Sequence, residues 1–186
     1  MTKWLEVRRH SLTKKGPSRG LGSHLSIEGI ALARAVGERI GPFAYVITGQ
    51  LPRHLETAVA MGFAVDGTVA LPSGHVTGEV DHHDQWGWDK PYVRYKEILD
   101  KQRGLARVAA EHRDIWLHAL ASVAEGDSAL VVSSGGAIEP ALVSCLPDDD
   151  HSGWGAPFGH CDGVRLAVED GRFVAATIDR ARPPQS

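Results

Sequence analysis

The sequence contains few cysteines and no long apolar run. Its two cysteines, Cys145 and Cys161, are too few for a secreted disulfide framework, and they lack the paired spacing of a zinc site. This usage is typical of a reducing compartment, so we expect a cytoplasmic protein. The N-terminal residues lack the apolar core of a signal peptide, and no run is long enough to span a bilayer. No membrane partner is therefore expected.

A concentration of positive charge is also missing. The formal net charge is −3, and the basic residues form no block that would mark a nucleic-acid-binding surface. We therefore expect a small molecule as the partner, and no nucleic acid. With 186 residues and 42% hydrophobic content, the chain is expected to form one domain, 1–186, that buries its core without disulfides. The oligomeric state is not predicted.

Strand and helix patterns alternate along the chain. Helix signals are Ser26 as a cap, Gly41-Pro42 as a stop, and Pro52 at the start of a second helix. Predicted strands occupy 4–7, 43–47, 64–71 and 128–132, and a final hairpin turns at 169–171; predicted helices occupy 26–40, 52–61, 92–125 with a break at Gly104, and 137–145. This order predicts an α/β fold, a three-layer sandwich whose largely parallel central sheet is flanked by helices.

The segment 72–91 differs in composition from its surroundings, because glycine, histidine and tryptophan are crowded into it. We interpret it as an ordered insertion over a site, in which Trp86, Trp88 and Tyr92 form either a lid or satellite packing. The tract 81–84, Asp-His-His-Asp, together with His75, could hold zinc or manganese. Adjacent histidines on a loop are weak evidence for such a site, so no metal is predicted.

Polar residues follow three of the predicted strands, at the edge of the sheet where ligands bind in open α/β folds. Arg9, His10 and Ser11 follow the first strand, Arg53 lies soon after the second, and the stretch 133–136, Ser-Ser-Gly-Gly, follows the inner strand. Arginine matches phosphate oxygens in planar pairs, and a glycine-rich turn that opens a helix presents free N–H groups. These residues predict an anion pocket.

The order of these motifs resembles the histidine phosphatase superfamily, also called phosphoglycerate mutase-like, over almost the whole chain. The family's Arg-His-Gly is matched at 9–11, its Leu-Thr-x-x-Gly at 25–29, and its Ser-x-x-x-Arg-x-x-x-Thr-Ala at 48–58. Each motif is weak alone, and their order carries the resemblance. The chain lacks the continuation typical of the mutase branch, so hydrolysis is favoured over mutase chemistry.

The resemblance implies phosphomonoester hydrolysis with His10 as the nucleophile, a phosphohistidine intermediate, and no cofactor. It implies phosphate binding by Arg9 and Arg53, with Ser134 and Gly135 at the loop that opens the last helix. A carboxylic acid from the variable segment should protonate the leaving oxygen. Glu79 is the first choice for this acid. Asp81 and Asp84 are alternatives, and all three could instead be solvated loop carboxylates.

The sequence departs from the family pattern at Ser134, where the family has its second histidine. A serine hydroxyl donates one hydrogen bond but carries no charge, so turnover should be slower. Restoring the histidine by Ser134→His is expected to raise the rate. His151 and His160 could compensate, although isolated histidines are more often structural. The alternative function is a non-catalytic phosphate-ligand binder on the same fold.

Overall fold

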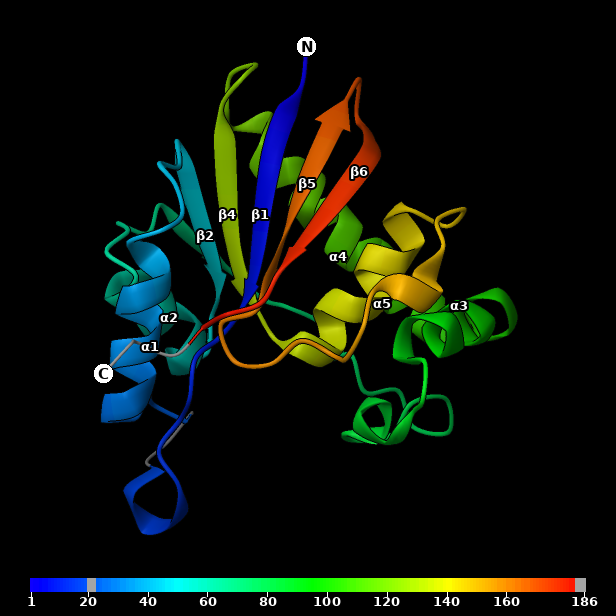
Figure 1. Cartoon of the computed structure of the whole chain (residues 1–186), viewed down its shortest axis with the longest axis horizontal. Coiled ribbons are helices and arrows are strands. Elements are labelled where there is room, and N and C mark those ends of the chain that lie inside the picture. The colour runs from blue at the N-terminus through cyan, green and yellow to red at the C-terminus, as the bar shows by residue number, and fades with distance from the viewer. Residues whose placement is uncertain (20–22, 183–186) are drawn as a thin grey trace.

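The computed structural model describes residues 1–19 and 23–182. Six strands form one sheet in the order β3-β2-β4-β1-β5-β6 (Figure 1). Strand β5 runs antiparallel to both of its neighbours, whereas the pairs β1–β4, β2–β4 and β2–β3 are parallel. The strands are β1 Lys3–Arg9, β2 Tyr45–Gly49, β3 Gly67–Val69, β4 Ser128–Ser133, β5 Gly163–Glu169 and β6 Arg172–Asp179.

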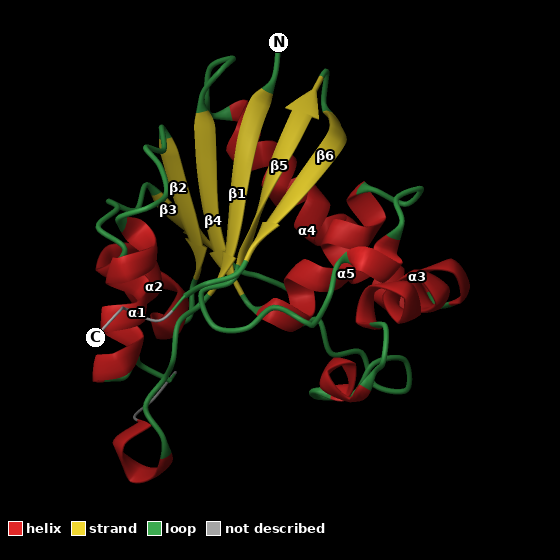
Figure 2. Ribbon diagram, viewed as in Figure 1, coloured by secondary structure: helices red, strands yellow, loops and turns green. Residues whose placement is uncertain are grey.

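Helices cover both faces of this sheet (Figure 2). Helices α1 and α2 pack together on one face, and α3, α4 and α5 pack together on the other. Their bounds are α1 Ile27–Gly37, α2 Pro52–Ala60, α3 Pro91–Lys101, α4 Arg103–Ala121 and α5 Gly135–Cys145. The predicted α/β sandwich is therefore confirmed. Within the two described ranges, no helix has the length and apolar character needed to cross a membrane.

Strand β4 shows how the sequence separates the two layers. Ala129 and Val131 belong to the large core under α3, α4 and α5, while Leu130 and Val132 pack with Ala58 of α2. Because successive side chains of a strand point to opposite faces, a continuous apolar run is what a strand buried on both sides requires. The run 128–132 was predicted as a central strand for this reason, and β4 lies between β2 and β1.

Several boundaries differ from the sequence prediction, and α1 ends at Gly37, before the predicted end at residue 40. Helix α1 is capped by Ser26, as predicted; Ile27 and Ile30 are exposed, whereas Gly29, Ala33 and Val36 are buried. A Cβ at Gly29 would lie 2.0 Å from the Leu12 carbonyl oxygen, so only glycine allows this close approach of helix and loop. The long helical region breaks at Gln102, two residues before the predicted break at Gly104.

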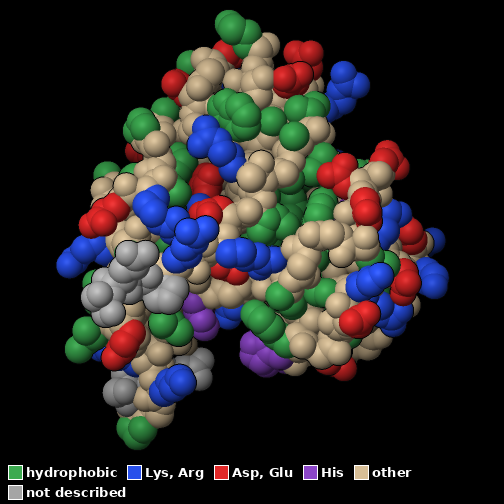
Figure 3. Space-filling model, in the orientation of Figure 1, with side chains coloured by type: hydrophobic (Ala, Val, Ile, Leu, Met, Phe, Trp, Pro, Cys, Tyr) green, Lys and Arg blue, Asp and Glu red, His purple; other side chains and the backbone are tan. Residues whose placement is uncertain are grey.

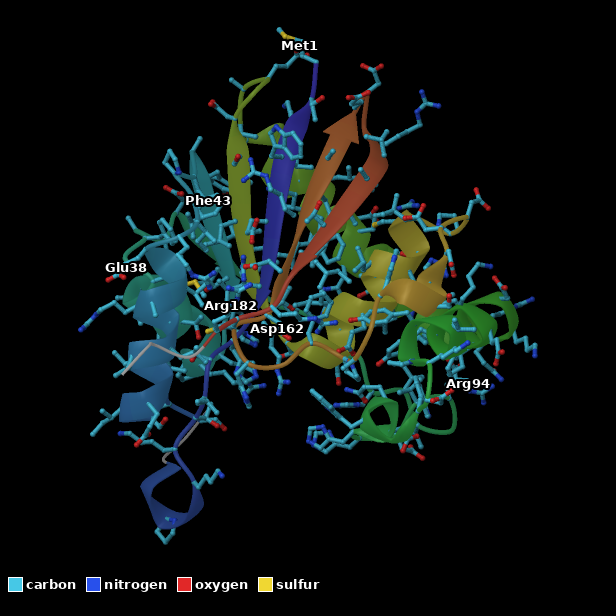
Figure 4. All side chains as sticks on the ribbon, in the orientation of Figure 1. Met1, Glu38, Phe43, Arg94, Asp162 and Arg182 are labelled. Carbon is cyan, nitrogen blue, oxygen red and sulfur yellow. The ribbon has the colours of Figure 1, made fainter. Side chains whose placement is uncertain are left out.

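The carboxyl ends of β1, β2 and β4 lie together at the lower end of the sheet in Figure 1, opposite the N-terminus. Asp162, labelled in Figure 4, lies at this end just before β5. Its carbonyl oxygen accepts a hydrogen bond from the Arg9 backbone N–H, and its carboxylate accepts from Arg180 and from the Gly159 N–H. The loop that precedes β5 is therefore tied to the end of β1.

Candidate active site

A cavity of about 110 Å³ lies at the carboxyl ends of the strands. The residues predicted to form an anion pocket line it together, and they come from distant parts of the chain: Arg9, His10, Arg53, Ser134 and Gly135. Ligand pockets for whole drug-sized molecules occupy about 300–1,000 Å³, so this cavity fits a single small group. A larger groove of about 830 Å³ lies between α1 and α2 and contains none of these residues.

His10 is buried, and its ring is held by its own loop. Its Nδ1–H lies 2.8 Å from the Ser11 carbonyl oxygen, to which it donates, so the proton is fixed on Nδ1. The Nε2 atom is then left with a lone pair. Burial lowers the pKa of His10 to about 2, and the nearby Arg9 guanidinium acts in the same direction. His10 is therefore a neutral imidazole with a nucleophilic nitrogen.

Arg9 is held in the cavity by the loop that precedes β5. Its Nη1 donates to the Phe158 carbonyl oxygen at 2.6 Å, and the Phe158 N–H in turn donates to Glu139 on α5 at 2.7 Å. The Arg9 Nε is buried without a hydrogen-bond partner among the described residues. Because a buried guanidinium N–H without an acceptor is costly, an anion that reached this donor would be bound favourably.

Glu139 is a buried carboxyl behind this arrangement. Burial raises its pKa to about 7, while hydrogen bonds from the Phe158 N–H and from Tyr95 act in the opposite direction. The Glu139 carboxylate attracts Arg9 but does not contact it, because the Phe158 backbone lies between the two side chains. Glu139 therefore holds the loop that orients Arg9.

Helix α2 carries Arg53 into the cavity, and Ser11 positions the helix. The Ser11 N–H donates to the Thr57 hydroxyl at 2.9 Å, and the Ser11 hydroxyl donates to the Gly29 carbonyl at 2.6 Å. Thr57 in turn donates to the Arg53 carbonyl at 2.7 Å. Ser11 is thus completely buried and joins the loop after β1 to both α1 and α2.

Ser134 occupies the N-cap position of α5, but its hydroxyl makes no capping bond. Its Oγ lies instead 2.9 Å from Nε2 of His54, which follows Arg53 on α2. Gly135 lines the cavity, and a Cβ there would lie 3.0 Å from Arg9 Cδ, so glycine leaves the room that the guanidinium needs. The N-terminus of α5 begins at Gly135 on the cavity wall, and the positive end of a helix dipole favours an anion there.

Sequence reasoning missed His54. Its ring is buried, and its centroid lies 5.6 Å from that of His10. Burial lowers the pKa of His54 to about 4, with Arg53 and His112 acting in the same direction. Its position beside a predicted phosphate-binding arginine was a usable signal, but His54 occupies an unspecified position of the motif matched at 48–58, so the family resemblance gave it no role.

The two histidines considered as compensating groups have different positions. The His151 ring donates through Nε2 to the Leu146 carbonyl at 2.8 Å, which is a structural role. His160 lies beside His10, with its ring centroid 5.7 Å from that of His10 and its Nε2 3.4 Å from Arg9 Nη2. Burial lowers the pKa of His160 to about 4. The His10 ring therefore has two neighbouring imidazoles, those of His54 and His160.

The insertion covers the opposite side of the cavity. Its lining side chains are His75, His82, His83, Gln85 and Trp86. The three imidazoles form a cluster with ring centroids 3.8 to 6.1 Å apart. In Figure 3 the visible histidine atoms lie on the two sides of a notch below the sheet.

The structure bears on two questions about the insertion: whether its aromatic residues form a lid, and whether its histidines could hold a metal. Trp86 lines the cavity, with its ring 5.8 Å from the Arg9 guanidinium carbon, whereas Trp88 packs on Tyr95 and Tyr92 is buried against Trp154. One aromatic residue therefore shapes the mouth, and the others are packing. Across residues 1–19 and 23–182, no group of three or more histidine, cysteine or acidic side chains has an arrangement that could hold a metal ion.

The three carboxylates predicted as possible acids do not line the cavity. The Glu79 oxygens accept hydrogen bonds from the Gly104 N–H at 3.0 Å and the Leu105 N–H at 2.6 Å, at the first turn of α4. Asp81 and Asp84 are exposed, and the Asp84 carboxylate accepts from the Asp81 N–H at 3.0 Å. In this arrangement Glu79 anchors the insertion to α4, and no carboxylate lines the described cavity.

Comparison with known proteins shows the same architecture. The sequence matches no protein-family model and no curated protein sequence. Among solved structures, it is similar to a phosphoserine phosphatase from Entamoeba histolytica in complex with 3-phosphoglyceric acid, with 18% identity, 97% of this chain and 98% of that chain covered, and a TM-score of 0.67. A mycobacterial glucosyl-3-phosphoglycerate phosphatase in complex with VO3 has 22% identity, 96% and 98% coverage and a TM-score of 0.65.

A third structure, described as mycobacterial hydrolase 2, has 21% identity, covers 100% of this chain and 93% of its own, and has a TM-score of 0.65. These likenesses extend over nearly the whole of each chain. The protein thus has the fold of the histidine phosphatase superfamily, and the resemblance found in its sequence is confirmed at the level of the fold.

Proposed function

We propose that the protein hydrolyses a small phosphomonoester through a phosphohistidine intermediate on His10. One observation carries the proposal: the neutral His10 imidazole, with its proton held on Nδ1, shares a small cavity with Arg9 and Arg53. Two guanidinium groups neutralise the non-bridging oxygens and hold the phosphorus near Nε2, and such positioning and charge neutralisation are the main catalytic factors in phosphoryl transfer.

The reaction has two displacement steps. In the first, the His10 Nε2 lone pair forms a bond to phosphorus, the ester P–O bond breaks, and the leaving oxygen takes a proton to give an alcohol. In the second, a water oxygen attacks phosphorus, the N–P bond breaks, and its electron pair returns to Nε2 while the water loses a proton. The products are an alcohol and inorganic phosphate.

The proton for the leaving oxygen must come from the substrate side of the cavity. Glu79 can serve as the predicted acid only if it leaves the backbone of α4, because both of its oxygens accept hydrogen bonds there. The insertion places three imidazoles, those of His75, His82 and His83, on the cavity wall. Burial and the neighbouring imidazole of His82 lower the pKa of His75 and of His83, and a bound phosphate dianion would act in the opposite direction. We therefore propose a histidine of this cluster as the acid.

The test is acid-quench detection of phosphohistidine after mixing the protein with a ³²P-labelled aryl phosphate. Label should appear on the wild-type protein within the first turnover and should be absent from His10→Ala, which is also expected to lack steady-state turnover. His118→Ala, on α4 and outside the cavity, is the matched control and should label normally. Turnover that persists in His10→Ala would overturn the proposal.

A second function is favoured by Ser134, because loss of one preorganised donor costs about 10²–10³ in rate. This second function is that of a binder, which holds a phosphate ligand without turning it over. Two measurements, phosphate affinity and phosphohistidine formation, distinguish the two functions. A binder shows affinity for inorganic phosphate by calorimetry but no phosphohistidine, whereas an enzyme shows both.

The substrate class follows from the size and charge of the cavity. A volume of about 110 Å³ accepts a phosphoryl group, and the rest of the substrate must extend past Trp86 and the imidazoles of the insertion. The solved phosphatases of this fold include one in complex with 3-phosphoglyceric acid. We therefore propose a small phosphorylated metabolite as the substrate, with no nucleic acid and no metal cofactor.

A further inference from the structure

The contact between α2 and α5 involves His54, a histidine to which the sequence motifs assign no role. His54 Nε2 lies 2.9 Å from Ser134 Oγ, and Ser134 lines the cavity in front of it. The His54 ring itself does not line the cavity and is only 2% exposed. The imidazole therefore reaches the cavity through the serine hydroxyl.

A purely structural role explains this imidazole poorly. Its Nδ1 is buried and has no hydrogen-bond partner among the described residues, a cost that an aliphatic side chain of similar size would avoid. Room for the ring also depends on Gly49, since a Cβ there would lie 2.1 Å from His54 Nδ1. Among the described residues, the ring makes its hydrogen bond with the cavity-lining serine.

The direction of this hydrogen bond decides what Ser134 can offer to a phosphate. If Nε2 accepts from the hydroxyl, the serine hydrogen is occupied and only oxygen lone pairs face the anion. If Nε2–H donates to Oγ, the hydroxyl hydrogen is free to bond a phosphoryl oxygen. Nδ1 is then an unprotonated acceptor, and no donor N–H is left buried without a partner.

We propose that His54 and Ser134 act as one phosphate-binding unit, in which His54 Nε2–H donates to Ser134 Oγ and orients the serine hydroxyl toward the phosphoryl oxygen. The inference rests on the proposed phosphate site. His54 is a positioning residue and Ser134 makes the contact. The pair puts an imidazole behind the one position where the sequence lacks the family's second histidine.

The test is a double-mutant cycle on the affinity for inorganic phosphate, measured by calorimetry on the intact chain. His54→Phe and Ser134→Ala should each weaken binding about tenfold, the usual range for a hydrogen bond to a charged group. The double variant should be no weaker than either single variant. His54→Gln, which keeps an N–H donor, should recover most of the affinity.

The control is His151→Phe, which removes another buried imidazole with a backbone hydrogen bond but outside the cavity. It should lower stability to urea and leave phosphate affinity unchanged. If the two single effects multiply, or if His54→Phe binds phosphate as well as the wild type, the unit does not exist. A wild type without measurable phosphate affinity overturns the inference as well.

A second measurement needs no substitution at His54 and so does not depend on the variant folding. Imidazole ¹⁵N NMR of the wild type should show His54 as the Nε2–H tautomer, and an Nδ1–H tautomer would overturn the inference. Neither experiment relies on turnover. Failure of the proposed function, seen as no phosphohistidine, is therefore distinct from failure of the His54–Ser134 unit, seen as an additive cycle or the wrong tautomer.

Discussion

His54 already occupies the space beside residue 134, and this changes what a substitution there should do. The sequence alone predicts that Ser134→His raises the rate, because it restores the family's second histidine. In the structure, Ser134 Oγ is at hydrogen-bond distance from the His54 ring, so a larger side chain at 134 would meet that ring. We therefore expect little or no gain in kcat from Ser134→His alone.

In the double variant Ser134→His/His54→Ala, removal of the His54 ring leaves space for the new imidazole at position 134. Its kcat for an aryl phosphate should exceed that of Ser134→His by at least about tenfold, the lower end of what one electrostatic donor contributes. Steady-state rates of the four proteins, with His54→Ala as the control, measure this. A single Ser134→His variant that is as active as the double would show that the ring does not block position 134.

The charge state of His10 gives a second prediction at this scale. Burial and the two arginines lower the pKa of His10 to about 2, so the imidazole should stay neutral from pH 5 to pH 8, with its proton on Nδ1. Imidazole ¹⁵N shifts of the free protein, assigned with His10→Gln, should show no titration of this ring in that range. A midpoint near 6.5, the ordinary value for histidine, would contradict the account of His10 as a buried neutral nucleophile.

At the scale of elements, Glu79 links the insertion to α4. Its carboxylate accepts two N–H groups of the first helical turn, and helix-capping contacts of this kind contribute about 0.5–2 kcal/mol. We expect Glu79→Ala to lower the free energy of unfolding by about 1 kcal/mol in urea titrations. The phosphohistidine burst should keep its amplitude and rate.

Asp81→Asn is the matched control for Glu79→Ala, because Asp81 lies two residues away, is exposed and makes no contact with α4 that the structure describes. It should change neither stability nor the burst. A large fall in the burst rate of Glu79→Ala, without a matching loss of stability, would return the acid role to Glu79 and argue against the imidazole cluster.

Elements with a strong local signal were predictable from the sequence. The apolar run at 128–132, the Ser26 cap and Pro52 at a helix start each follow from backbone chemistry that needs no tertiary partner. Helix α1 shows the limit of this approach. Its exposed Ile27 and its buried Gly29 are set by the approach of the loop at Leu12, which no local pattern encodes.

Some residues of the candidate site were predictable from the sequence, and others were not. His10, Arg9 and Arg53 follow strands at the edge where open α/β sheets bind ligands, so the predicted topology was enough to expect them close together. The partners of His54 and Glu79 lie 80 and 25 residues away in the sequence. Those contacts depend on how α2 meets α5 and how the insertion meets α4, and that information lies in packing, not in motif spacing.

At the scale of the whole molecule, the cavity exists only when both helical layers are in place on the sheet. Arg53 belongs to α2, Ser134 and Gly135 to the start of α5, and His10 to the loop after β1. Figure 1 shows α2 and α5 on opposite sides of the lower end of the sheet. An unfolded chain cannot bring these groups around one anion. Phosphate should therefore bind the native state alone and stabilise it by mass action.

The size of this stabilisation is fixed by the affinity. At a phosphate concentration about 100 times Kd, the free energy of unfolding should rise by about 2.7 kcal/mol relative to chloride at the same ionic strength. Arg53→Met should lose most of that increment, because it removes a guanidinium from the cavity wall. Urea titrations with and without phosphate measure both quantities.

Arg94→Met is the control, since Arg94 is an exposed residue on α3, paired with Glu97 and far from the end of the sheet in Figure 4. It should keep the full phosphate increment, because an exposed ion pair contributes little to stability and nothing to the cavity. Equal phosphate increments in Arg53→Met and Arg94→Met would mean that phosphate acts on the protein surface in general. In that case the guanidinium groups at the end of the sheet would not form an anion site.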